Sequence, residues 1–231
     1  MSCTDEKKPN SEIDPSVLNH KLAQLQKTVY GIDMSLTNPG LVKIDPSTHK
    51  VSLYYFRNRQ IEHNALVRVS DHRSSFYGWF WEVVCIEEEK DLSQYSRFSS
   101  KISKLMALIG DNFNKTSCVG IEGYSMNSRT GKSGTILMEL GGCLRLALAT
   151  YEHKWVEIPP RSVKKQFTGN GKADKNEMYQ YYLQKYHLPE LCNLIGLKQI
   201  YKQTPHPVED LVDALADGLS TLFSMTPCDS T

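Results

Sequence analysis

The chain has 231 residues, of which 40% are hydrophobic and 23% charged, and its formal net charge is +1. This composition is typical of one soluble globular domain, and the near-neutral charge restricts any nucleic-acid surface to a local patch. No apolar stretch approaches the roughly 20 residues that span a bilayer, and the polar N-terminus lacks the apolar core of a signal peptide. The cysteines form no C-x-x-C pair, which favours a reducing intracellular location without a disulfide framework or zinc site. Cys118 and Cys143 lie in apolar runs and are predicted to be buried.

The N-terminal third predicts a small antiparallel unit. Residues 1 to about 15 are polar and are expected to have no fixed structure. A short helix follows from Asp14-Pro15 to Gln26, since aspartate caps a helix and proline fits its first turn. Three strands are predicted next, separated by turn signals at Asn38-Pro39-Gly40 and Asp45-Pro46-Ser47, and they make an antiparallel meander over 28–34, 41–44 and 51–56.

Residues 57–95 show no clear periodicity and contain an aromatic cluster around Trp79. After them, apolar residues recur at helical spacing from Phe98 to Phe113. This helix and the aromatic cluster offer apolar material either for an interface or for the core. The remaining elements alternate as strand 118–122, helix 136–148, strand 154–158, and helices from about 162, over 175–186 and from 204–207 to 223. The glycine pair at 141–142 lies inside the 136–148 helix, where glycine costs about 1 kcal/mol against alanine, so close backbone packing is the expected reason. This alternation predicts an α/β layered fold.

Four acidic residues lie at the ends of elements that can converge. Asp33 and Glu122 each close an apolar strand, whereas Asp210 and Asp213 lie on one face of the last predicted helix. Several carboxylates together repel unless a cation neutralises them, and magnesium takes a few carboxylates together with waters and phosphate oxygens. The pattern therefore indicates a metal-dependent enzyme acting on phosphodiesters.

Simpler interpretations of these acids remain open. An aspartate that closes a strand is often only a turn former. Asp210, Asp213 and Asp217 are spaced i, i+3 and i+7, which equally fits a surface helix with a solvated acidic stripe. His206 lies one turn earlier, where it can assist a metal or a proton transfer, or merely pack.

A basic patch follows the 154–158 strand. Its five cations lie within fifteen residues, opposed by Asp174, and comprise Arg161, Lys164, Lys165, Lys172 and Lys175. They fit a phosphate-binding face or a solvated helix and loop. The glycine-containing loop at 168–175 lacks the Walker spacing, so no nucleotide-binding P-loop is indicated. Tyr124 is placed to stack on an unpaired base, which is worth roughly 1–3 kcal/mol, or to pack in the core.

In this order, the motifs resemble the RuvC family of Holliday-junction resolvases, within the ribonuclease H-like superfamily and closest to its phage-type members. The stretches that carry the resemblance are GIDMSLTN (31–38), IEGY (121–124) with ELGGCLR (139–145), IPPRSVKK (158–165) with TGNGKADK (168–175), and EDLVDALA (209–216). The segment at 57–105 is longer and more aromatic than its counterpart in that family.

The resemblance implies a fold, a set of residues and a function. The fold would be a mixed sheet, an antiparallel three-stranded meander plus parallel strands, flanked by helices. The nuclease domain would span 28–223, with tails at 1–27 and 224–231. Asp33, Glu122, Asp210 and Asp213 would be the catalytic, metal-binding acids, and Lys164 and Lys175 would contact phosphate. Magnesium or manganese, as two ions per site, a homodimer, and branched DNA as partner would follow, without a membrane.

The function expected is therefore metal-dependent cleavage of four-way DNA junctions, in a bacterial cytoplasm or in a virus-infected cell. An alternative of the same class is a debranching nuclease that cuts flaps and forks as well. A different class, the actin-like and sugar-kinase ATPases, also has a first strand of the form G-I-D-x-S/G, but those folds are longer and duplicate the motif.

Overall fold

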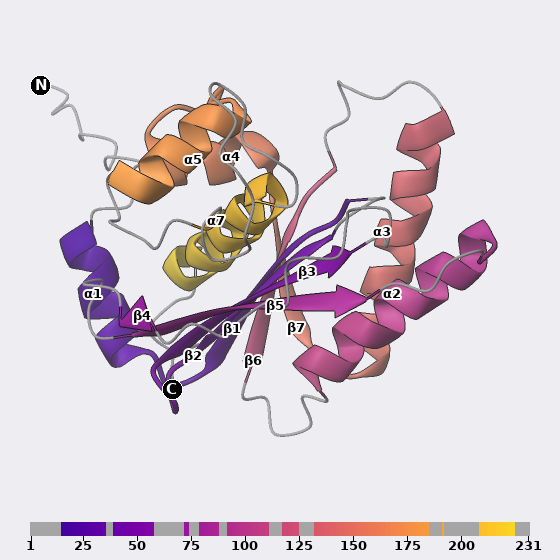
Figure 1. Ribbon diagram of the computed structural model, residues 1–231, viewed down its shortest axis with the longest axis horizontal. Helices are drawn as coiled ribbons and strands as arrows, with labels where there is room; N and C mark the ends of the chain where they lie inside the picture. Colours follow the sequence, from indigo (N-terminus) through magenta and orange to yellow (C-terminus); the bar gives the residue numbers. More distant parts are fainter. Residues whose placement is uncertain are drawn as a thin grey trace, which may run out of the picture.

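The computed structural model describes residues 15–35, 39–57, 72–73, 79–87, 92–110, 117–124, 132–184, 191 and 208–224 (Figure 1). Within them, one seven-stranded sheet has the order β4-β5-β3-β2-β1-β6-β7. Its strands are β1 (Thr28–Asp33), β2 (Gly40–Asp45), β3 (Lys50–Arg57), β4 (His72–Arg73), β5 (Phe80–Glu87), β6 (Ser117–Glu122) and β7 (Lys154–Ile158).

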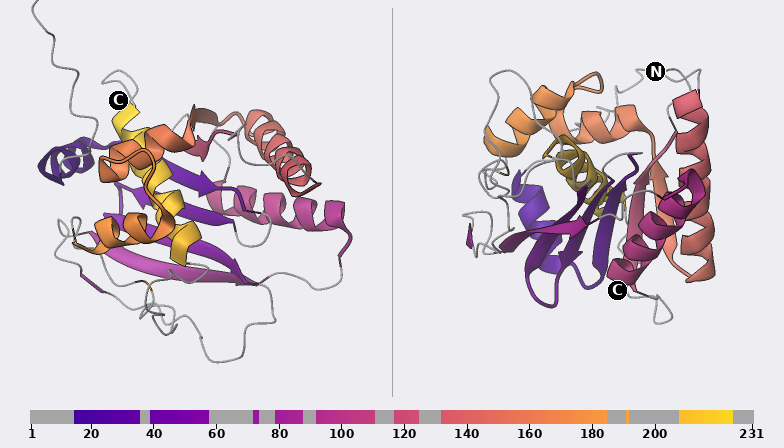
Figure 2. Two further views of the ribbon diagram at one scale, coloured as in Figure 1. Left: turned by 90° about the horizontal axis from the view of Figure 1, so that it is seen from above. Right: turned by 45° about the vertical axis from the view of Figure 1, so that its right-hand side comes forward.

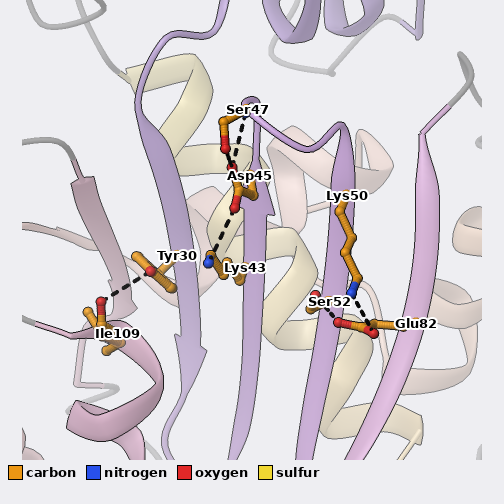
Figure 3. Close-up of polar contacts among 8 residues, drawn as sticks. All are labelled: Tyr30, Lys43, Asp45, Ser47, Lys50, Ser52, Glu82 and Ile109. Carbon is orange, nitrogen blue, oxygen red and sulfur yellow. Dashed lines mark hydrogen bonds and ion pairs between the residues drawn. The ribbon is translucent and has the colours of Figure 1, made fainter. Parts of the chain in front are cut away.

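The predicted meander and the parallel half of the sheet are both confirmed. β2 pairs antiparallel with β1 and β3, while β6 runs parallel to β1 and β7 runs parallel to β6. The turn after β2 forms as its sequence indicates: the Asp45 carboxylate accepts hydrogen bonds from the Ser47 backbone N–H, at 3.0 Å, and pairs with Lys43 Nζ at 3.3 Å (Figure 3). The fold class is therefore the one that the sequence predicts.

The aromatic segment contains a strand that periodicity did not reveal. β5 pairs parallel with β3, and its flanking and inward residues Trp79 and Trp81 are each 3% exposed. Glu82 on β5 reaches across to β3, where its carboxylate accepts from Ser52 Oγ and lies 2.7 Å from Lys50 Nζ (Figure 3). The segment thus widens the sheet, and the tryptophans are core residues rather than interface residues.

Helices cover both faces of the sheet (Figures 1 and 2). One face carries α1 (Pro15–Gln24), α4 (Pro160–Thr168), α5 (Lys175–Gln184) and α7 (Val208–Ser224), whose buried residues share one core cluster. The other carries α2 (Gln94–Ile109) and α3 (Lys132–Thr150), which build the second cluster. None of the described helices is long and apolar enough to cross a membrane.

The structure decides two alternatives about exposure that the sequence left open, and it contradicts one expectation. The apolar stripe of α2 lies in the second core cluster, at Phe98, Ile102, Leu105 and Met106. The helix α7 is not a surface helix with a solvated stripe, because nearly all its side chains are buried. Cys143 is exposed on α3, whereas Cys118 is buried as expected.

Glycines on the α7 side of the sheet let that helix lie directly on the strands. A Cβ at Gly31 would lie 2.1 Å from the Ala214 carbonyl oxygen, and one at Gly40 would lie 2.4 Å from the Asp210 carbonyl oxygen. A Cβ at Gly120 would overlap Thr221 Oγ1. We call Gly31, Gly40 and Gly120 the glycine platform. It lets α7 cross β2, β1 and β6 in turn at backbone contact, as glycine within a strand often permits.

The far end of α7 is held by the N-terminal helix. Lys21 on α1 donates from Nζ to the carbonyl oxygens of Leu222, at 3.4 Å, and Phe223, at 3.5 Å. Its ammonium also lies 5.0 Å over the Phe223 ring. A cation at a helix C-terminus is favourable because the last carbonyls carry partial negative charge. Leu22 and Leu25 complete the contact by entering the α7-side core.

Candidate active site

Asp33 and Glu122 lie side by side at the carboxyl ends of neighbouring strands. β1 and β6 are parallel, and Ile32 pairs with Ile121 immediately before the two acids. Side chains alternate between the faces of a sheet. Asp33 is two residues beyond Gly31 and Glu122 two beyond Gly120, and both glycines face α7. The two acids therefore project to the same face, toward α7.

The helix α7 brings its own acids to this edge. Asp210 begins the crossing above Gly40 and is 2% exposed, and the Asp213 side chain is 22% exposed. Both lie on the helix face that packs toward the sheet. Asp33 and Glu122 lie on strands from the N-terminal and middle parts of the chain, whereas Asp210 and Asp213 lie on the last helix. Because the glycine platform lets α7 contact these strands directly, it brings the four acids together.

The electrostatics show that the acids share one site. The pKa of the Asp33 carboxyl is raised well above its usual range by burial and by the nearby carboxylates of Asp213, Glu122 and Asp210, against an opposing effect of Lys175. The pKa of Asp213 is raised to about 7, chiefly by burial, with Lys175 opposing the shift and Glu122 adding to it. Such mutual destabilisation of carboxylates is the situation that a divalent cation relieves.

Asp217 is a fifth acid at the same place. It is 1% exposed, and neither of its carboxylate oxygens has a hydrogen-bond partner among the described residues. Burial raises its pKa well above the usual value, and the nearby carboxylates of Glu122, Asp33 and Asp213 add to the effect. Spacing placed Asp217 on the acidic face, and the structure adds that this face is buried.

Lys175 lies at the mouth of this carboxylate cluster, by which we mean Asp33, Glu122, Asp210 and Asp213. Its Nζ is 2.9 Å from Glu209 Oε1, 3.8 Å from Asp210 Oδ1 and 4.0 Å from Asp213 Oδ2. Burial lowers the pKa of Lys175, but the hydrogen bond to Glu209 and the neighbouring aspartates outweigh it, so that the pKa is raised overall. Lys175 is thus a charged lysine directed at acids, a role that the sequence did not predict.

The backbone around Lys175 is fixed by a capping box. The Asp174 N–H donates to Glu177 Oε2 at 2.9 Å, and the Glu177 N–H donates to Asp174 Oδ1 at 2.8 Å. This reciprocal pair closes the N-terminus of α5, so Asp174 serves as a cap. Lys164 steadies the same loop because its Nζ donates to the Ala173 carbonyl oxygen at 2.8 Å.

The other predicted cations lie on the adjoining surface. Arg161 and Lys165 are exposed on α4, and Lys172 is exposed in the loop between α4 and α5. The loop leaves α4 through Gly169, whose φ of 78° lies in the left-handed region that glycine favours. α4 and α5 both pack on α7, and α4 begins directly after β7, whose last residue, Ile158, pairs with Glu122.

Tyr124, two residues after Glu122, is clamped against α3. Its hydroxyl donates to the Met138 carbonyl oxygen at 2.9 Å and accepts from Arg145 Nη1 at 2.7 Å. The Arg145 guanidinium lies 4.3 Å over the Tyr124 ring and also holds Glu157 through two hydrogen bonds of 2.7 and 3.0 Å. A Cβ at Gly141 would lie 2.5 Å from the Tyr124 hydroxyl. The close packing expected at the glycine pair is therefore found at Gly141, whereas a Cβ at Gly142 would meet nothing within 4 Å, so the expectation is wrong there.

Two residues of this region have contacts that the sequence does not predict. Glu209 and Arg145 belong to the motifs at 209–216 and 139–145, which assign them neither a role nor a partner. The only available signals were their positions, beside Asp210 and one turn beyond Gly141, and neither signal indicates a contact across the fold. His206 lies outside the described residues.

The cluster has the donor chemistry of a magnesium or manganese site, since every acidic ligand is a carboxylate oxygen. In the described part of the chain, however, no three acidic, histidine or cysteine side chains converge closely enough to hold one ion as they stand. Lys175 provides a reason, because its ammonium faces two of the four acids. Loading a metal would require these side chains to turn inward and the lysine to withdraw.

Comparison with known proteins supports the fold. No protein-family model matches the chain, and no curated protein matches it significantly. Among solved structures, Thermus thermophilus RuvC in complex with a Holliday junction substrate shares 18% identity at a TM-score of 0.50, over 86% of this chain and 94% of that one. Thermus thermophilus RuvC alone shares 16% identity at 0.47, over 85% and 95% of the two chains. The yeast mitochondrial Holliday junction resolvase Ydc2 shares 12% identity at 0.40, over 90% and 92%. The chain thus has the RuvC fold, as its motifs predict.

Proposed function

We propose that the protein is a metal-dependent DNA endonuclease that cuts four-way junctions. The observation that carries the proposal is the assembly of Asp33, Glu122, Asp210 and Asp213, from three separate elements, beside lysines on a RuvC fold. A merely structural acidic cluster would not need to lie at the carboxyl edge of the sheet with a basic surface bordering it. That edge is where open α/β sheets place their ligands.

The four carboxylates would hold two magnesium or manganese ions. When bound, such ions supply an activated water nucleophile and stabilise the leaving oxygen of a phosphodiester. The residues of the chain would do the rest. Asp33 and Glu122 are fixed by the paired ends of β1 and β6, and Asp210 and Asp213 by α7, so little reorganisation of the backbone is needed. Closing the metal contacts would then fall to the side chains.

The DNA would approach over α4 and the loop before α5. Arg161, Lys165 and Lys172 are exposed there and would attract backbone phosphates, as cations at a nucleic-acid surface do without reading sequence. Lys164 and Lys175 lie nearer the acids and would meet the phosphate that is cut. Tyr124 is 40% exposed, and because Arg145 covers one face of its ring, it would offer the other face to an unpaired base.

Cleavage of a substrate panel tests the proposal. Four-way junctions, three-way junctions, flaps and linear duplex would be incubated with the protein and Mg²⁺ or EDTA. We expect cutting of the four-way junction with Mg²⁺ only, and none by Asp33→Asn or Asp213→Asn, which should still bind the junction. Equal cutting of flaps and forks would favour the debranching alternative. No cutting of any branched substrate by the folded wild-type protein would refute the nuclease proposal.

We further propose that two copies act together through α3. That helix exposes Met138 and Leu146, which are 47% and 70% exposed and lie on one face together with Gly142. Apolar side chains presented together in this way are typical of an interface. A two-fold dimer would match the two symmetric strands of a four-way junction.

The oligomer is tested by sedimentation and cross-linking. Leu146→Asp should convert a dimer to a monomer at micromolar concentration. A short bis-maleimide should cross-link the wild-type dimer through the exposed Cys143, and Cys143→Ser, which retains the dimer, should remove that product. A wild-type chain that sediments as a monomer, free and bound to a junction, would exclude the dimer.

A further inference from the structure

The ammonium of Lys175 stands where a metal ion would be expected to exert its charge. It faces Asp210 Oδ1 at 3.8 Å and Asp213 Oδ2 at 4.0 Å, and its closest contact is Glu209 Oε1 at 2.9 Å. Two of these acids belong to the carboxylate cluster of the proposed nuclease, on which this inference rests. The third, Glu209, has no part in that cluster.

The position of Glu209 allows it to hold this lysine. It lies in the first turn of α7, next to Asp210, and its side chain is 10% exposed. On the other side, the capping box fixes the backbone at the first residue of α5, which is Lys175 itself. The Lys175 side chain is 47% exposed, so it has room to turn toward solvent while its Glu209 contact is kept.

We propose that Lys175 is the resident cation of the metal-free carboxylate cluster, and that Glu209 is a positioning residue that keeps the ammonium at the mouth of the site when a metal ion displaces it from Asp210 and Asp213. Metal and lysine compete for the same two carboxylates. After displacement, the ammonium remains on Glu209, where it faces outward to the DNA phosphate.

If lysine and metal compete, removal of Lys175 should tighten metal binding. Loss of a lysine that only contacts DNA would leave metal binding unchanged. With no DNA present, Lys175→Met should bind Mn²⁺ roughly three- to tenfold more tightly than the wild type, since a half-exposed cation facing several carboxylates has been removed. The metal-free variant should melt at a lower temperature in EDTA, because like charges then face each other without the ammonium. Mn²⁺ should raise its melting temperature more than it raises that of the wild type. Mn²⁺ binding is measured by electron paramagnetic resonance of the free ion.

A matched control separates local from overall charge. Lys154→Met removes the same charge from an exposed lysine at the opposite end of the β6–β7 pair, where Lys154 pairs with Cys118 and not with Glu122. It should leave Mn²⁺ affinity unchanged. Equal tightening by both variants, or no tightening by Lys175→Met, would overturn the proposal.

A double-mutant cycle tests the part of Glu209. Glu209→Gln should weaken Mn²⁺ binding several-fold when Lys175 is present, because the released ammonium stays on Asp210 and Asp213. In the Lys175→Met background the same change should have a clearly smaller effect. An equal factor in both backgrounds would show that Glu209 acts by its own charge, and would overturn its positioning role.

The outcomes also separate this inference from the proposed function. If Lys175→Met folds only with Mn²⁺, the result is the same in a stronger form, whereas failure to fold with or without Mn²⁺ makes Lys175 structural and overturns the inference. Tighter Mn²⁺ binding by a protein that cuts no DNA would leave the inference standing and remove the nuclease. Unchanged affinity in a protein that does cut junctions would do the reverse.

Discussion

The glycine platform is the feature that assembles the site, and Gly31→Ala is the change that tests it. The new methyl carbon would lie 2.1 Å from the Ala214 carbonyl oxygen and 2.3 Å from the Gly218 nitrogen. Both are backbone atoms of α7, so no side-chain rotation relieves the clash. Since a real Cβ does not come closer than 3.0 Å to such atoms, the helix would have to withdraw by about 0.9 Å.

The cost follows from what α7 contacts. Overpacking a well-packed core typically costs about 1–3 kcal/mol, occasionally more, and the upper end applies because the helix backbone must move as a whole. For a chain of this size, 1 kcal/mol lowers the melting temperature by roughly 2–4 °C, so we expect a drop of roughly 6–12 °C. Withdrawal also carries Asp213 away from Asp33, and Mn²⁺ affinity should therefore fall along with stability.

Thermal and urea unfolding measure the first effect and Mn²⁺ titration of the folded protein the second. Gly123→Ala is the matched control, since its methyl would meet nothing closer than the Ile158 carbonyl oxygen at 3.5 Å, an ordinary contact. It should change stability by about 0.5 kcal/mol or less. A Gly31→Ala protein as stable as the wild type, with unchanged Mn²⁺ affinity, would refute the reasoning that backbone contact at this glycine holds the site together.

Three further predictions concern charge. Asp217→Asn should raise the free energy of unfolding of the metal-free protein at pH 8 by more than about 1 kcal/mol, because the amide cannot ionise and each unit by which folding raises a carboxyl pKa costs about 1.4 kcal/mol above that pKa, and change it little near pH 4. The sign follows from its raised pKa: the folded state holds a proton that the unfolded chain releases, so this aspartate lowers stability as pH rises from the unfolded toward the folded pKa. Equal effects at both pH values would contradict this. Mn²⁺ affinity should be weaker at pH 6 than at pH 8, because the pKa of Asp213 is raised to about 7 and protons compete with the metal below it; a flat profile over this range would contradict it. Arg145→Met should cost less than about 1 kcal/mol of stability, since Glu157 is largely solvated, but should slow single-turnover cleavage by releasing Tyr124 beside Glu122; unchanged cleavage would dismiss the clamp.

The sequence predicted the meander, the parallel strands and the ends of most helices because these depend on local signals. Turn residues separated β1, β2 and β3, a short buried apolar run marked β6, and the two prolines at 159–160 marked the end of β7. β5 escaped because its apolar residues, at 80–81 and 83–86 on either side of Glu82, do not alternate with polar ones. Such a run carries no periodicity that separates a strand from a buried helix segment.

The parts of the site that depend on contacts between distant segments could not be predicted from the sequence. Spacing showed that Asp210, Asp213 and Asp217 share a face but not whether that face meets solvent or sheet. The deciding residue was Gly31, whose missing Cβ allows α7 to cover the strands, and a glycine in a strand does not name its partner. For Lys175 the sequence predicted a contact with phosphate. It did not reveal the contacts with Glu209 and Asp210, because these join segments far apart in the chain.

The position of α7 along the chain has a consequence for synthesis. A domain generally folds as a unit once its chain has been synthesised, and the strands carrying Asp33 and Glu122 emerge well before α7 does. Until α7 is synthesised and docks, the platform glycines lack the helix that contacts them, and Asp210 and Asp213 are not in place. A chain that ends before residue 208 would therefore lack two of the four proposed metal ligands. The proposed nuclease activity would depend on synthesis of the chain through α7.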